Sequence, residues 1–167
     1  MVTARLSFLL SLSCFAVALV AAALLLPDEV PLHFSGSGEP DRWGTRSEAL
    51  LTMGLVGALL AVVLGASAAL ADRVPITLLN VPHKDWWTAT PERERRMRAM
   101  MRADLHVIGA ATVLFLTLLV VVTTTAARSE DPALGPVFFL GLACFLVFVV
   151  AWTVWSTRTR YRRRDDA

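Results

Sequence analysis

Charged side chains are absent from four long stretches of this chain, and that absence sets the class of protein. The stretches without Asp, Glu, Lys or Arg are Leu6–Pro27, Ala49–Ala71, Leu105–Ala127 and Pro132–Thr157, with lengths of 22, 23, 23 and 26 residues. A helix needs about 20 mainly apolar residues to cross the hydrocarbon core of a bilayer. In a soluble domain, charged residues would interrupt the apolar runs at shorter intervals. We therefore predict an all-α, polytopic membrane protein with a bundle of four transmembrane helices.

The predicted organisation is a single membrane domain over residues 1–167, because four apolar helices in lipid pack as one bundle. The transmembrane spans are expected at about 6–26, 49–71, 105–127 and 136–157. A loop at 72–104 joins the second and third spans, and a basic tail follows the fourth at 158–167.

The basic residues are unevenly distributed among the segments outside the spans. Thirteen of the 16 Lys and Arg residues lie in the N-terminal tail, the 72–104 loop and the C-terminal tail. The two remaining segments contain only Arg42, Arg46 and Arg128. Lys and Arg are enriched on the cytoplasmic side of membrane proteins. Both termini and the 72–104 loop are therefore predicted to be cytoplasmic, and the other two segments to face outward.

Sequence signatures of catalysis and coupled transport are also missing. No Asp, Glu, Lys or Arg lies inside a predicted span, where ion-coupled transporters usually carry one. The chain has no phosphate-binding glycine loop, no His-Glu-x-x-His zinc motif and no Gly-x-Ser-x-Gly elbow. The two cysteines, Cys14 and Cys144, lie within spans and are expected to be buried apolar side chains, not a disulfide. We expect a non-enzymatic protein without a cofactor.

The segment between the first two spans has its own local structure. Prolines and glycines are frequent from residue 27 to residue 44, which excludes a regular helix. Val30 to Phe34 is expected to be extended, and Ser35 to Gly38 to form a turn, where glycine allows positive φ. The indole of Trp43 is expected at the outer headgroup level.

His33, Asp41 and Trp43 in this segment are the candidate ligand-binding residues. Residues 28–48 hold five carboxylates and two arginines, which would attract a cationic ligand at low salt. Depletion of basic residues from outward-facing loops would give the same imbalance without a ligand. A histidine near carboxylates could bind a divalent cation, but the spacing matches no metal motif. No metal site is predicted, and a structural hydrogen bond is the expected role of His33.

The 72–104 loop contains the candidate contacts on the cytoplasmic side. Thr90 followed by Pro91 indicates a helix start. Residues 91–104 then either lie flat in the headgroup layer or extend the third span. Arginines from 93 to 102 are expected to face water and anionic lipid, at about 1 kcal/mol of attraction each. The residues expected to contact lipid or a cytoplasmic partner are Trp86, Trp87, Arg93 and Arg96.

Small residues form a stripe on the second span. Gly57, Ala61 and Gly65 are four residues apart, so they share one helix face. Such a face lets another helix approach closely. The stripe predicts either packing within the chain or contact with a second copy in a homo-oligomer.

The segment between the first two spans, residues 27–44, carries a longer sequence pattern. It consists of Pro27, Val30–Pro31, His33–Phe34, Gly38–Glu39–Pro40–Asp41 and Trp43–Gly44. Set between two spans, this pattern resembles the N-terminal domain of unknown function in SdpI-type bacterial membrane proteins. The resemblance covers about residues 10–65, and the segment Asn80–Trp87 resembles related small proteins. It implies the cytoplasmic membrane of a bacterium, and it brings no catalytic residues.

The resemblance suggests two functional hypotheses. Some SdpI-type proteins confer immunity to a secreted toxic peptide and signal by holding a repressor at the membrane. The first hypothesis is a sensor or immunity-type protein with a peptide or envelope ligand outside and a transcriptional regulator inside. The alternative is an accessory subunit of a transporter or channel, motivated by the small-residue stripe. Nucleic acid is not an expected partner, because a basic tail directly after a span more often fixes topology or binds anionic lipid.

Overall fold

Four long apolar helices form the body of the molecule, as predicted. The computed structural model describes residues 2–163. Each of the four helices is long and apolar enough to cross a membrane, which indicates a multi-pass protein in a lipid bilayer. Their bounds are α1 (Val2–Leu25), α2 (Arg46–Leu70), α4 (Pro91–Ala127) and α5 (Pro136–Trp155), the last continued by the π-helical turn η2 (Ser156–Arg160).

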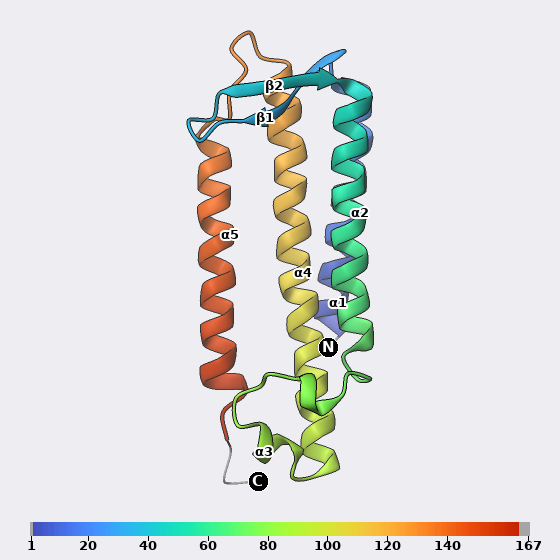
Figure 1. Cartoon of the computed structure of the whole chain (residues 1–167), viewed down its shortest axis with the longest axis vertical. Helices are drawn as coiled ribbons and strands as arrows, with labels where there is room; N and C mark the ends of the chain where they lie inside the picture. Colours follow the sequence, from blue (N-terminus) through green and yellow to red (C-terminus); the bar gives the residue numbers. More distant parts are fainter. Residues whose placement is uncertain (1, 164–167) are drawn as a thin grey trace.

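Helix α4 lies at the centre of the bundle, with α1 and α2 packed on one side and α5 on the other (Figure 1). A β-hairpin crosses one end of the bundle, here called the hairpin end. Short elements gather at the opposite end, called the α3 end, and both the start of α1 and the end of η2 lie toward it (Figure 1). These short elements are η1 (Ile76–Leu78) and α3 (Lys84–Thr88).

The tightest packing joins α1, α2 and α4 through aromatic rings that fill notches at glycines. Phe15 of α1 lies against Gly57 of α2, so closely that a Cβ at Gly57 would overlap its ring. Phe8 of α1 lies between Gly65 of α2 and Gly109 of α4. Because helices in lipid associate by close van der Waals packing, these notches stabilise the three-helix unit. Part of the small-residue stripe is therefore in contact within the chain, and Ala61 between the two glycines is half-buried.

Helix α4 is one continuous helix, and this settles the alternative left open for residues 91–104. Thr90 accepts a hydrogen bond from the amide of Arg93 at 3.3 Å, and Pro91 occupies the first turn. At 1.5 Å per residue, the 37 residues of α4 extend over roughly 55 Å. Residues 91–104 thus extend the third span beyond the thickness of a hydrocarbon core of about 30 Å.

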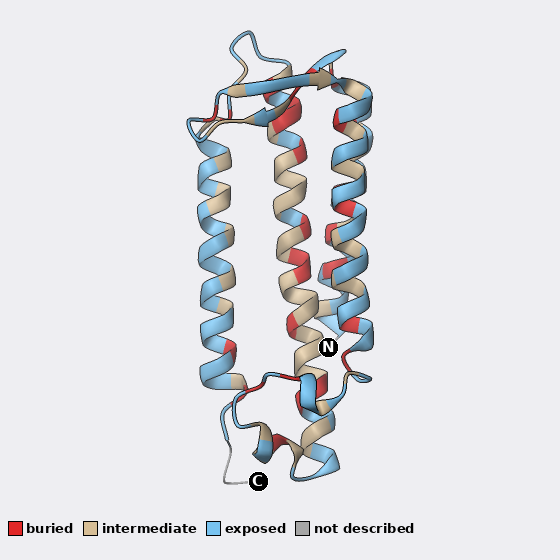
Figure 2. Cartoon of the chain, in the orientation of Figure 1, coloured by how far each residue is buried: buried red, intermediate tan, exposed pale blue. Residues whose placement is uncertain are grey.

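Helix α5 packs differently from the other three, because none of its residues from Pro136 to Trp155 is buried; the buried Ser156 at its foot belongs to η2 (Figure 2). It touches α4 through the stacked rings of Phe115 and Phe145, whose centroids are 4.8 Å apart, and through Gly141 against Leu118. The remaining apolar surface of α5 is left for lipid or for another chain.

The prediction for the two cysteines was wrong about their burial. Cys14 on α1 and Cys144 on α5 are both free thiols on exposed positions. The aromatic residues Phe8, Phe15 and Phe115 fill the interior faces instead, so the small cysteines are left on the apolar outer surface.

Candidate functional site

The hairpin end combines a small antiparallel sheet with the adjoining ends of the helices. Strand β1 (Glu29–Phe34) pairs with β2 (Pro40–Thr45), and the regular ladder becomes irregular after Pro31. The expected extended segment and turn are present, whereas β2 was not anticipated from the sequence. Val30 is completely buried and anchors β1 on the helices.

The base of the hairpin is fixed by the start of α2. Arg46 donates to the Asp28 carboxylate at 2.9 Å and to the carbonyl oxygen of Pro27 at 3.3 Å. Thr45 caps α2 by accepting from the amide of Glu48, whose carboxylate also accepts from Arg42 at 2.8 Å. The ion pairs are exposed and contribute little individually, so the cap and the buried Val30 position the hairpin base.

The tip of the hairpin docks on the connection between α4 and α5. The amide of Leu134 donates to the carbonyl oxygen of Gly38 at 2.8 Å. Gly38 has a φ of 90°, a conformation that L side chains rarely adopt. A Cβ at this position would also lie 2.9 Å from the carbonyl oxygen of Leu134. Glycine is therefore required here for both the turn and the docking contact.

An apolar cavity of about 300 Å³ lies beneath the hairpin. This size is at the lower end of the range for small-molecule sites. Helix α2 contributes one wall, α4 another, and β1 the roof. The lining residues include Pro31, Leu32, His33, Phe34, Met53, Val56, Leu116, Leu119, Thr123 and Leu134. The cavity is large enough to hold an apolar group.

Two of the three predicted ligand-binding residues meet at the edge of this cavity. Nδ1 of His33 lies 2.6 Å from a carboxylate oxygen of Asp41 across the two strands. The His33 side chain also lines the cavity, while most of its surface remains accessible. Trp43 lies on the same hairpin opposite Pro31 and is 43% exposed. Within residues 2–163, no three His, Cys, Asp or Glu side chains gather as a metal would require.

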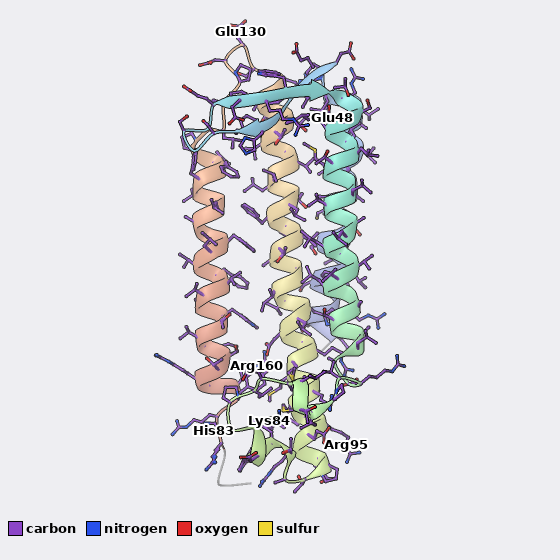
Figure 3. All side chains as sticks on the ribbon, viewed as in Figure 1. Glu48, His83, Lys84, Arg95, Glu130 and Arg160 are labelled. Carbon is purple, nitrogen blue, oxygen red and sulfur yellow. The ribbon has the colours of Figure 1, made fainter. Side chains whose placement is uncertain are left out.

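A polar cluster at the α3 end was not found from the sequence. Asp104 on α4 is buried and forms an ion pair with Arg160 of η2, which Figure 3 labels between the foot of α5 and α4. The hydroxyl of Tyr161 donates to the same carboxylate at 2.8 Å. Burial, reinforced by this hydrogen bond, raises the pKa of the Tyr161 phenol. Two features of the sequence could have indicated this cluster: Asp104 is the last charged residue before the third span, and Tyr161 is the single tyrosine of the chain.

Trp87 belongs to the same interior, which corrects its assignment as a surface contact. Its side chain is 3% exposed, and its indole nitrogen donates to the backbone oxygen of Tyr161 at 3.2 Å. The other tryptophan, Trp86, is half-buried beneath the guanidinium of Arg93, which lies 4.1 Å from the ring centroid. This stacking keeps Arg93 at the surface while it covers the aromatic ring. Arg96 is exposed, as a contact residue requires.

Arg98 is a second correction, because it was expected to face water with its neighbours. It is 8% exposed, and its guanidinium donates to the carbonyl oxygens of Ala71 at 2.8 Å and Val74 at 2.9 Å. Glu94 pairs with the same group at 2.8 Å. A cation at the carbonyl end of α2 is favoured by the helix dipole. Arg98 thus attaches the end of α2 to α4.

The comparisons with known proteins bear on the hairpin end. Residues 9–58 match the sequence model of a domain of unknown function, DUF1648. No curated protein and no solved structure matches the chain. The matched residues comprise most of α1, the whole hairpin and the first half of α2. The match agrees with the expected domain of unknown function and contains the hairpin with His33, Asp41 and Trp43, whereas the resemblance to SdpI-type proteins stays a prediction.

Proposed function

We propose that this chain is a non-enzymatic sensor or immunity-type membrane protein that receives a peptide or envelope ligand at the hairpin end. The observation that carries the proposal is the apolar cavity beneath the hairpin, with His33 and Asp41 paired at its edge. A ligand with one apolar group and a polar or cationic part fits this combination. The apolar group would enter the cavity, and the polar part would meet the carboxylate-rich hairpin.

The arrangement of α4 supports a connection from this site to the opposite end. Leu116, Leu119 and Thr123 of α4 line the cavity, and the same helix carries the exposed Arg96 at the α3 end. A transcriptional regulator or anionic lipid would meet Arg93, Arg96 and Trp86 there. With the basic segments in the cytoplasm of a bacterium, the ligand would arrive from outside the cell.

The test combines binding with a cellular readout. The full chain, in lipid nanodiscs, is titrated with a synthetic cationic amphipathic peptide of Leu and Lys, and cells that express the chain are challenged with the same peptide. The triple variant His33→Ala, Asp41→Ala, Trp43→Ala should lose binding and protection while remaining in the membrane. Glu130→Ala removes a carboxylate from the same end of the molecule, away from the cavity, and should keep both (Figure 3). Equal behaviour of the triple variant and the wild type would disprove the assignment.

An accessory-subunit role is the second candidate, and the exposed surface of α5 favours it. Leu140 and Val147, seven residues apart on one face, are each 67% exposed. If a larger membrane partner packs there, tryptophan at both positions should abolish co-purification. Tryptophan at Leu24, which is 78% exposed on α1, is the matched control. Co-purification that survives both sets of changes would remove this candidate.

A further inference from the structure

A second cavity lies toward the α3 end, among α1, α2 and α4, and has a volume of about 610 Å³. Part of its wall is apolar, from Phe8 on α1 and from Gly65 and Ala69 on α2. The rest carries nitrogen-bearing side chains, namely Arg5 on α1 with Arg102 and His106 on α4. No residue proposed for ligand or regulator binding lines this space, so it is separate from the function proposed above.

The basic side chains of this cavity have hydrogen-bond donors to spare. Arg102 uses Nη1 in its ion pair with Asp72, and its guanidinium has four further N–H donors. Nδ1 of His106 donates to the backbone oxygen of Arg102 at 2.8 Å, so the Nε2 of this tautomer is an acceptor and the donors for an anion come from the two arginines. Arg5 is exposed, and no carboxylate among residues 2–163 pairs with it. The site therefore favours an anion.

The cavity also stands at the boundary between polar and apolar layers of the protein. Arg5 directly precedes the first charge-free stretch, and Arg102 lies just before the third. Phe8 lies inside the first charge-free stretch, and Gly65 lies inside the second. A ligand that fills the space must be anionic at one end and apolar at the other. Basic pockets between membrane helices recognise anionic lipid headgroups in this way.

We propose that this cavity binds one anionic phospholipid. Arg5 and Arg102 hold the phosphate, Nε2 of His106 accepts from a hydroxyl of the headgroup, and the first part of an acyl chain packs against Phe8 and Ala69. The bound lipid would join α1 to α2 and α4 at the end of the bundle where Gly65 leaves space.

Native mass spectrometry of the full-length protein tests the proposal. The protein is released from detergent after equilibration with equal amounts of phosphatidylglycerol and phosphatidylcholine, and bound lipid is counted. The wild type should retain phosphatidylglycerol preferentially. Arg5→Ala and Arg102→Ala should each weaken its retention by about fivefold. Arg158→Ala removes an exposed arginine from the same end without touching the cavity and should leave retention unchanged.

Two further measurements distinguish a bound lipid from a bound soluble anion. Ala69→Leu fills the cavity without changing charge and should reduce retention by a similar factor. Excess inorganic phosphate should not displace the lipid, because phosphate lacks the acyl chain; full displacement would identify a soluble anion as the ligand. Equal retention of the two lipids, or an Arg5→Ala protein that behaves like Arg158→Ala, would overturn the proposal. Should Arg102→Ala fail to fold, Arg5→Ala and Ala69→Leu still decide the outcome.

Discussion

Helices α1 and α5 both pack on α4, yet they are held in different ways. Along its length α1 inserts Phe8 and Phe15 into notches of its neighbours and buries small residues such as Ala22. No residue of helix α5 is buried, and apart from the contacts of Phe145 and Gly141 with α4 it is attached near its two ends. At one end, Leu134 bonds to Gly38, and at the other, Arg160 and Tyr161 bond to Asp104. The contrast separates a packed three-helix unit from a helix that is fastened at its ends.

The largest effect is expected from filling a notch in the three-helix unit. Gly57→Leu places a side chain where the Phe15 ring lies, and overpacking of this kind costs about 3 kcal/mol of folding free energy. Thermal unfolding in detergent should show a large loss of stability for the whole protein. Gly54→Leu, on the same helix with open space around it, is the control and should change little. Similar losses for both variants would contradict the packing role of the notch.

The next effect should come from the attachment of α5 at the α3 end. Asp104→Ala leaves Arg160 and the Tyr161 hydroxyl without their partner, at a cost of about 2 kcal/mol. Hydrogen exchange should rise in the last turns of α5 while α1 and α2 stay protected. Asp85→Ala, an exposed aspartate at the same end, serves as control. Uniform loss of protection across all four helices would show that α5 is not an independent unit.

A smaller effect is expected at the other attachment. Gly38→Ala forces an alanine into positive φ and against the Leu134 carbonyl, which should cost about 1 to 2 kcal/mol. Gly36→Ala in the same turn has open space and is the matched control. Exchange rates of the Leu134 amide, compared between the two variants, measure whether the hairpin tip has detached.

The smallest effect is expected in the middle of α5. Phe145→Leu removes the stacked pair with Phe115, and such a pair contributes about 0.5 to 1 kcal/mol. A slight drop in thermal stability should result, below that of Asp104→Ala. A greater loss than at Asp104 would show that α5 is held along its length after all.

The four helices were predictable because the absence of charge is a local property of each stretch. The hairpin was only half predictable, since β2 contains Pro40, Asp41 and Gly44, which are poor strand formers. Its extended shape depends on pairing with β1. Asp104 and Arg160 are 56 positions apart in the sequence, and no local sequence pattern indicates a contact between residues so widely separated. His33 and Asp41 could be proposed together because both lie within one short segment between spans, and the structure brings their side chains into contact, whereas their role in ligand binding stays a prediction.

The unbroken course of α4 limits how the two ends of the molecule can influence each other. A helix of 37 residues resists stretching, because elongation would break its ladder of backbone hydrogen bonds. A structural change under the hairpin can therefore be transmitted through α4 to the opposite end only as a tilt or a rotation of the whole helix. Spin labels at Glu92 and Thr125, both exposed on α4, would keep a constant separation in every state, whereas the distance from either label to α5 would change.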